Sequence, residues 1–145
     1  MRRPVYVPSI DPAQIRPPSR EVYGLMGEAK IFAMIEDFYG ELERSPLRPL
    51  FPADMAAASR RSAAFFVGLL GGPPLYHQRY GNPMMRARHL PFAITLATRE
   101  EWLHCFERVL ERAVERHRFP AQHLAGFRDF LRDFSLWMVN TETDP

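Results

Sequence analysis

Apolar residues recur at helical spacing in four long stretches of the chain, and no stretch alternates apolar and polar residues as a half-buried strand does. The first stretch runs from Glu21 to Glu43. Gly24 and Gly27 interrupt its beginning, which predicts a short helix followed by a longer one. The apolar face of the longer helix consists of Ile31, Ile35, Phe38 and Leu42. The pattern as a whole predicts an all-α fold.

Three more long helices follow from this spacing and from their boundary residues. A helix over 56–70 begins with small residues, ends with large ones and stops at Gly71-Gly72-Pro73-Pro74. The run Thr98-Arg99-Glu100-Glu101 is a capping box, which predicts the start of a helix that frays near His117. Pro120 opens the last helix. The apolar stripe of that helix consists of Leu124, Phe127, Leu131, Phe134 and Met138.

A short helix is predicted between Asn82-Pro83 and Pro91. Asn82 suits the capping position and Pro83 the first helical position, whereas Pro91 ends the helix because it has no N–H donor. His89 therefore lies near the C-terminal end of a short and stiff helix. A side chain held in this way is well placed to coordinate a ligand.

Residues 1–20 show no helical periodicity and are rich in proline. We expect an arm that is extended or disordered, and we interpret it as a passive tail. Residues 21–145 are predicted to form a single domain. The prolines of the arm are Pro4, Pro8, Pro12, Pro17 and Pro18.

The composition is that of an ordinary soluble domain, with 46% hydrophobic and 25% charged residues in a chain of 145. Eleven Phe, five Tyr and two Trp suit a core or a pocket around a flat, apolar ligand. A formal net charge of +2 is too small to indicate nucleic-acid binding. Cys105 is the single cysteine, which excludes an internal disulfide and favours a reducing compartment. Because no apolar run has bilayer length and no signal-peptide core is present, we expect a cytoplasmic protein without membrane association.

The histidines are the first candidates for chemistry. They include no metal-binding pair on one helix face, and one cysteine cannot complete a thiolate zinc site. The sequence also lacks the Gly-x-Ser-x-Gly turn of serine hydrolases and a glycine-rich phosphate loop, which disfavours those enzyme classes. The five histidines are His77, His89, His104, His117 and His123.

His89 differs from an ordinary isolated histidine, which most often has a structural role or faces solvent. It lies on the short helix, and it is flanked by Arg86 and Arg88, whose charges favour the neutral imidazole that a metal needs. An all-α chain rich in Phe is also the setting in which one axial histidine holds haem iron. These features make His89 a candidate metal ligand.

Several motifs occur in a fixed order between Val22 and Asn140. They are Phe38-Tyr39, Leu50-Phe51-Pro52, Gly71-Gly72-Pro73, Tyr76, Arg79, Gly81, Pro83, the run from Arg86 to Ile94, Trp102 and Met138-Val139-Asn140. With these motifs the chain resembles a truncated haemoglobin of the second group, a bacterial globin-like protein. The resemblance implies a globin-like two-over-two helical sandwich with a short proximal helix and an extended N-terminal arm. It also implies haem b as the cofactor.

The resemblance places residues on both faces of that haem. His89 matches the proximal ligand, which binds iron through Nε2 and donates its Nδ1–H to a carbonyl one turn earlier. On the distal side, Tyr39 and Trp102 match the two donors that face the bound ligand. Ala58 falls where many globins place a distal histidine, and Ser62 faces the same pocket. Further haem contacts are implied for Phe51, Phe65 and Phe92, and propionate contacts for Arg88, Arg79 and Tyr76.

Each of these residue types also has a more ordinary interpretation. Taken alone, Tyr39 and Trp102 are typical core aromatics, and the Phe65-Phe66 pair suits the core in either case. Cys105 is interpreted as a small buried hydrophobic residue. Arg60-Arg61 is interpreted as part of a solvated face. The same interpretation applies to Glu107, Arg108, Glu111, Arg112 and Glu115.

The resemblance implies the binding of dioxygen, NO or CO, and a general role in oxygen binding or transport. A charge-assisted hydrogen bond contributes roughly 1.5–3 kcal/mol, so two distal donors predict slow oxygen release. Slow release suits a scavenger, a sensor or a redox catalyst better than a carrier, and peroxidase-like or NO dioxygenase activity stays open. An unidentified reductase and a homodimer are the expected protein partners. The alternative is a haem-free globin-like sensor or interaction module.

Overall fold

The computed structural model describes residues 4–142, in which helices are the regular structure and no strand occurs. Three single-turn 3-10 helices connect or precede the α-helices, at Pro12–Gln14, Arg48–Leu50 and Ala121–His123. No helix within 4–142 is both long and apolar enough to span a membrane. The α-helices are α1 (Val22–Met26), α2 (Glu28–Glu43), α3 (Met55–Leu69), α4 (Leu75–Tyr80), α5 (Met85–His89), α6 (Leu96–His117) and α7 (Leu124–Met138).

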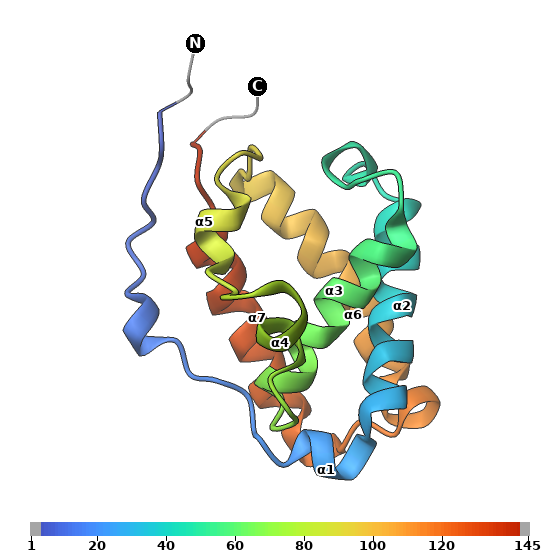
Figure 1. Ribbon diagram of the computed structural model, residues 1–145. Coiled ribbons are helices and arrows are strands. Elements are labelled where there is room, and N and C mark those ends of the chain that lie inside the picture. Colours follow the sequence, from blue (N-terminus) through green and yellow to red (C-terminus); the bar gives the residue numbers. More distant parts are fainter. Residues whose placement is uncertain (1–3, 143–145) are drawn as a thin grey trace.

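The four long helices form two layers, as the predicted two-over-two sandwich requires. Helix α2 packs against α3 in one layer, and α6 packs against α7 in the other, with α2 also contacting α6 between the layers. Figure 1 shows α2 and α3 in front of α6 and α7, with the short helices α4 and α5 beside them. The all-α prediction and its two-over-two arrangement are confirmed.

Aromatic rings occupy the centre of the core, where the layers meet. Phe38 of α2 stacks on Phe106 of α6 with ring centroids 4.0 Å apart, and Phe127 of α7 meets Phe106 edge to face at 5.7 Å. Edge-to-face and offset contacts of this kind add to the free energy gained by burying the rings. Cys105 is fully buried, so its interpretation as a small hydrophobic residue is confirmed.

Two predicted helix starts are wrong by two or three residues, and a 3-10 turn separates Pro120 from the start of α7 at Leu124. Helix α6 begins at Leu96, because Thr95 rather than Thr98 is the N-cap: the Thr95 hydroxyl accepts a hydrogen bond from the Thr98 N–H at 3.0 Å. Helix α5 begins after Met84, whose left-handed backbone (φ 35°) breaks the run from Asn82. The Thr95 cap sets the start of α6 and the backbone of Met84 sets the start of α5. The spacing of apolar residues indicates neither boundary.

Gly71 allows the chain to cross itself where α3 ends. Its φ of 106° is a conformation that side chains disfavour, and a Cβ there would lie 1.9 Å from the Arg20 carbonyl oxygen. Beside it, the Tyr23 N–H donates to the Leu70 carbonyl at 2.9 Å. The predicted helix stop thus also joins the end of the arm to the domain.

The N-terminal arm is extended over the residues that the structure describes, apart from its one 3-10 turn. It runs beside α7 and α5 (Figure 1), and Pro8 and Pro18 are buried. The Tyr6 N–H donates to the Asn140 carbonyl at 2.9 Å. These contacts do not fit a passive tail. Of the residues assigned to the arm, 1–3 lie outside the described residues, and a domain boundary at residue 20 stays a prediction.

The C-terminal end of α6 is tied to α2 rather than frayed. His117 is only 5% exposed, and its Nε2 lies 2.7 Å from Asp37 Oδ2, which also accepts from Arg116 Nε at 2.6 Å. Burial favours a higher pKa for the Asp37 carboxyl. Hydrogen bonds and charges from Arg116 and His117 outweigh this effect and hold the pKa of Asp37 below its usual value.

Replacing Asp37 by asparagine is expected to lower the free energy of unfolding at neutral pH by about 1 kcal/mol, since the pair is partly exposed to solvent. A lowered carboxyl pKa stabilises the folded state above the unfolded-state pKa, and this contribution is lost as pH falls through the folded-state pKa. Urea unfolding should therefore show the difference between wild type and Asp37→Asn closing in acid. A difference that stays constant with pH would contradict the ion-pair explanation.

Candidate functional site

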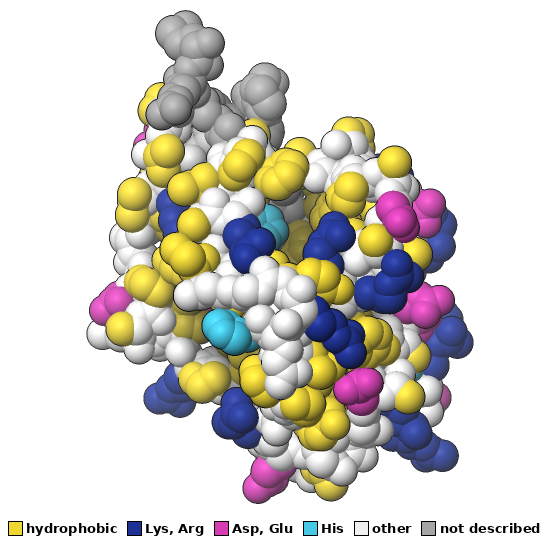
Figure 2. Space-filling view, viewed as in Figure 1, with side chains coloured by type: hydrophobic (Ala, Val, Ile, Leu, Met, Phe, Trp, Pro, Cys, Tyr) yellow, Lys and Arg dark blue, Asp and Glu magenta, His cyan; other side chains and the backbone are white. Residues whose placement is uncertain are grey.

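A cavity of about 540 Å³ opens between the two helical layers. It is lined by side chains from α2, α3, α4, α5, α6 and α7, most of them aromatic or aliphatic. Figure 2 shows the opening, with hydrophobic side chains inside it and basic side chains around its rim. The cavity has the size and apolar character of a site for a small molecule or cofactor.

Nearly all the site residues expected from the sequence meet in this cavity. Arg79 is the exception: it is an exposed residue of α4 and does not belong to the lining. The expected residues that line the cavity are Tyr39, Phe51, Ala58, Ser62, Phe65, Tyr76, Arg88, His89, Phe92 and Trp102.

His89 is held on α5 in a defined tautomer. Its Nδ1 lies 2.6 Å from the Met85 carbonyl oxygen. Because a carbonyl can only accept, Nδ1 carries the proton and Nε2 has the lone pair that a metal needs. Burial lowers the pKa of His89, against the opposing effect of the hydrogen bond to Met85, so the ring is neutral at neutral pH.

The guanidinium groups of the two flanking arginines bond to main-chain carbonyls and do not supply the positive charge next to His89 that the sequence predicts. The Arg86 guanidinium donates to main-chain carbonyls of α7 and the arm. The Arg88 guanidinium donates to the Asn82 carbonyl at 2.7 Å and lies over the Tyr76 ring, 5.4 Å from its centroid. Burial, rather than nearby positive charge, is therefore the main cause of the lowered pKa.

Tyr39 and Trp102 reach the cavity from α2 and α6, and Phe38 lies between them. The Phe38 ring meets Tyr39 edge to face at 5.7 Å and Trp102 at 5.4 Å. Burial raises the pKa of the Tyr39 hydroxyl, while a hydrogen bond with Ser62 acts in the opposite direction. The Tyr39 hydroxyl therefore keeps its proton well above neutral pH and can donate it to a hydrogen bond.

Helix α3 presents small residues to the cavity where α2 presents Tyr39. Ala58 is buried, and Ser62 lies one turn further along the same face. Phe65 follows on this face, and its ring also packs against Phe134 of α7 with centroids 5.9 Å apart. Phe65 is therefore both a core residue and a cavity residue, so its two interpretations do not exclude each other.

Arg61 was wrongly interpreted as part of a solvated face, because it lines the cavity and is half-buried. Helical spacing carried the signal: Arg61 is three residues after Ala58 and four before Phe65, which places all three on one face. The lining contains no Asp or Glu, and the sequence has none between Asp54 and Glu100. The cavity is thus positively charged at its rim.

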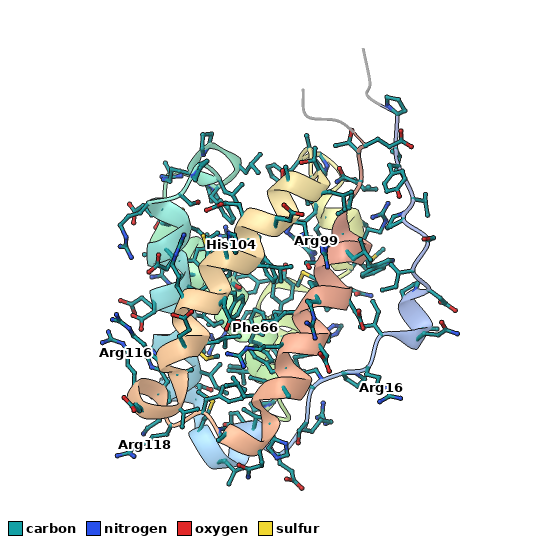
Figure 3. All side chains as sticks on the ribbon, turned by 180° about the vertical axis from the view of Figure 1, so that it is seen from behind. Arg16, Phe66, Arg99, His104, Arg116 and Arg118 are labelled. Atoms are coloured by element: carbon teal, nitrogen blue, oxygen red, sulfur yellow. The ribbon has the colours of Figure 1, made fainter. Side chains whose placement is uncertain are left out.

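Sequence reasoning also missed the part of the cavity between α6 and α7. Arg99, labelled in Figure 3, comes from α6 and reaches α7, where it donates to the Ser135 hydroxyl at 3.1 Å and the Arg132 carbonyl at 3.0 Å. The helical spacing along α7 indicated an apolar stripe, but it did not indicate that part of this helix lines the cavity. The missed lining residues in this part are Ile94, Thr98, Arg99, Phe134, Ser135 and Met138.

The donor set fits a planar, apolar group that carries carboxylates and one metal ion. Aromatic side chains supply the walls, Arg61 and Arg88 can pair with carboxylates, and the neutral ring of His89 can bind a metal. Within residues 4–142, no group of three or more His, Cys, Asp or Glu side chains is arranged to hold a metal ion. A single histidine with a porphyrin matches this chemistry better than a site built from protein ligands alone.

The fold and the cavity together define a two-over-two globin whose cavity is lined by a single histidine, His89. The family described as bacterial-like globin matches residues 21–137, and the chain belongs to this family. Membership implies that the protein binds haem, which is the cofactor class expected from the sequence. The predicted resemblance to group 2 truncated haemoglobins is confirmed.

Individual relatives agree with this assignment. The group 2 truncated hemoglobin YjbI of Bacillus subtilis is 39% identical over 90 residues, which cover 61% of this chain and 68% of the relative. The crystal structure of phosphate-bound Hell's gate globin IV is similar with a TM-score of 0.81 and 33% identity, over 90% of this chain and 81% of that one. The truncated oxygen-avid haemoglobin from Bacillus subtilis has a TM-score of 0.74 and 33% identity. The match covers 81% of this chain and 98% of that one.

Proposed function

We propose that this protein holds haem b and binds dioxygen and other diatomic ligands such as NO and CO reversibly. One observation carries the proposal: a neutral His89 with Nε2 available lines the same cavity as Tyr39 and Trp102, although the three come from different helices. Haem would supply an iron atom with an open coordination position for the ligand. His89 would hold that iron, and Arg61 and Arg88 would pair with the propionates.

The distal residues would then control how fast a ligand leaves. A protonated Tyr39 hydroxyl and the Trp102 indole N–H are donors in a mostly apolar cavity, where hydrogen bonds to a partly negative ligand are stronger than in water. Both donors would slow the release of dioxygen. A relative described as oxygen-avid has the same fold, which supports this part of the proposal.

Slow release favours scavenging, sensing or redox chemistry on oxygen, NO or peroxide over transport. Redox turnover would need an electron donor, and we propose a reductase in the cytoplasm as its source. A homodimer is also compatible with the proposal. The alternative of a haem-free sensor or interaction module gives no role to the tautomer fixed by the contact between His89 and Met85.

The first experiment is the visible absorption spectrum of the purified protein, recorded before and after reduction and again under carbon monoxide. We expect a strong Soret band that shifts on reduction and shifts further with the gas, because one axial position is open to ligands. A pyridine haemochrome spectrum would identify the haem as type b. Absence of a Soret band even after haem is added would contradict the proposal and favour the haem-free alternative.

A further inference from the structure

Arg86, three residues before His89, joins α5 to two distant parts of the chain. Its guanidinium donates to the carbonyl oxygens of Trp137 at 2.5 Å and Val139 at 2.8 Å, at the end of α7. It also donates to the Tyr6 carbonyl of the N-terminal arm at 2.8 Å. One side chain thus connects the histidine helix, the last helix and the arm.

Asn140 holds the chain on the other side of His89. It is 1% exposed, and its Nδ2 donates to the carbonyls of His89 at 3.2 Å and Phe92 at 2.9 Å. Its Oδ1 accepts from the Ile94 N–H at 3.0 Å. Its own main chain bonds to the arm, because the Tyr6 N–H donates to the Asn140 carbonyl.

Helix α5 has few other contacts that fix its position: Met85 packs at the edge of the core, and Arg88 donates to the Asn82 carbonyl and lies over the Tyr76 ring. The helix is five residues long, follows a left-handed residue and contains no buried residue. A helix this short is not stable by itself, because nucleation is costly and few hydrogen bonds form. The position of His89 therefore depends on contacts made from outside the helix.

We propose that Arg86, Asn140 and the main chain at Tyr6 form a clamp that positions His89 toward the haem iron. We call these three residues the α5 clamp. Arg86 and Asn140 are positioning residues, since they act through the backbone of α5 and the loop after it. The part that concerns iron rests on the proposed function, whereas the immobilisation of α5 does not.

The immobilisation of α5 can be measured without haem, by NMR-detected hydrogen exchange on the full-length apo protein. The reporters are the N–H groups of Arg88, Leu90 and Phe92, which bond to carbonyls within this segment. Exchange at these amides should be at least about tenfold faster in the clamp variants. The variants are Arg86→Met, Asn140→Leu and Tyr6→Pro. Tyr6→Pro removes the arm's N–H donor together with the phenol ring and keeps the carbonyl that accepts from Arg86.

Arg48→Met is the matched control, because Arg48 also donates to three main-chain carbonyls, those of Phe51, Pro52 and Ala53. It should leave exchange in α5 unchanged. Arg86→Lys keeps the charge without the planar fork and should fall between wild type and Arg86→Met. Wild-type exchange rates in the clamp variants would overturn the clamp, whether or not the protein binds haem.

The positioning of iron needs a second measurement on the haem-loaded protein. The iron–histidine stretching band of the ferrous form, seen by resonance Raman, should shift or broaden in the clamp variants and stay unchanged in Arg48→Met. Haem should also transfer to an acceptor apoprotein about tenfold faster or more. An unshifted band together with unchanged haem loss would overturn the positioning role. A wild-type protein that takes up no haem would instead contradict the proposed function.

Discussion

Replacing His89 by alanine is expected to abolish stable retention of haem. The variant removes the single side chain of the cavity that combines a neutral ring with an available nitrogen, whereas the aromatic walls remain. Loss of the neighbours that orient a metal ligand already costs about 10–100-fold in affinity, so loss of the ligand itself should exceed about 100-fold. The measurement is the haem content after purification, followed by the rate of haem transfer to an acceptor apoprotein.

His77→Ala is the matched control, since His77 is an exposed histidine on α4 and should have no effect on haem retention. Added imidazole should restore haem binding to His89→Ala, because it can occupy the space that the side chain leaves. The helical content of the apo variant should stay at the wild-type level, since α5 contains no buried residue. Unchanged haem retention in His89→Ala would show that another group holds the iron.

The sequence predicted part of the cavity lining and the ends of two helices beside it, because the signals for those helix ends are local. Pro91 marks the end of the histidine helix, and Gly71-Gly72-Pro73-Pro74 marks the end of α3, since each residue type restricts the backbone by itself. The resemblance then placed Tyr39 and Trp102 on one cavity, which neither helical pattern nor composition could do. Their roles as ligand donors remain predictions, although both residues line the cavity.

Contacts between distant segments could not be predicted in the same way. Asn140 bonds to the carbonyl of His89, which lies 51 residues earlier, and no property of either local sequence points to the other. Thr95 and Thr98 are equally good caps by composition, and the choice depends on where the preceding loop places the backbone. Arg61 could not be placed from its residue type alone. Its charge is typical of a solvent-exposed residue, whereas its helical position puts it on the face that lines the cavity.

Removing either distal donor is expected to speed the release of dioxygen by about tenfold or more. Tyr39→Phe keeps the ring and its edge contacts with Phe38 and Phe51, so only the hydroxyl is lost. Trp102→Phe removes the indole N–H but also reduces contact with Phe38, so its unfolding should be measured beside its kinetics. Stopped-flow displacement of dioxygen by carbon monoxide gives the off-rates.

Tyr76→Phe separates the distal effect from a general response of the cavity to the loss of a hydroxyl. Tyr76 lines the same cavity from α4 and packs near Arg88, on the side proposed for the propionates. The rate of dioxygen release from Tyr76→Phe should therefore match that of wild type. If Tyr39 and Trp102 donate to the same ligand, the double variant should depart from the product of the single effects, since groups that share a partner are not additive. Wild-type off-rates in both single variants would mean that neither residue donates, and slow release would then need another cause.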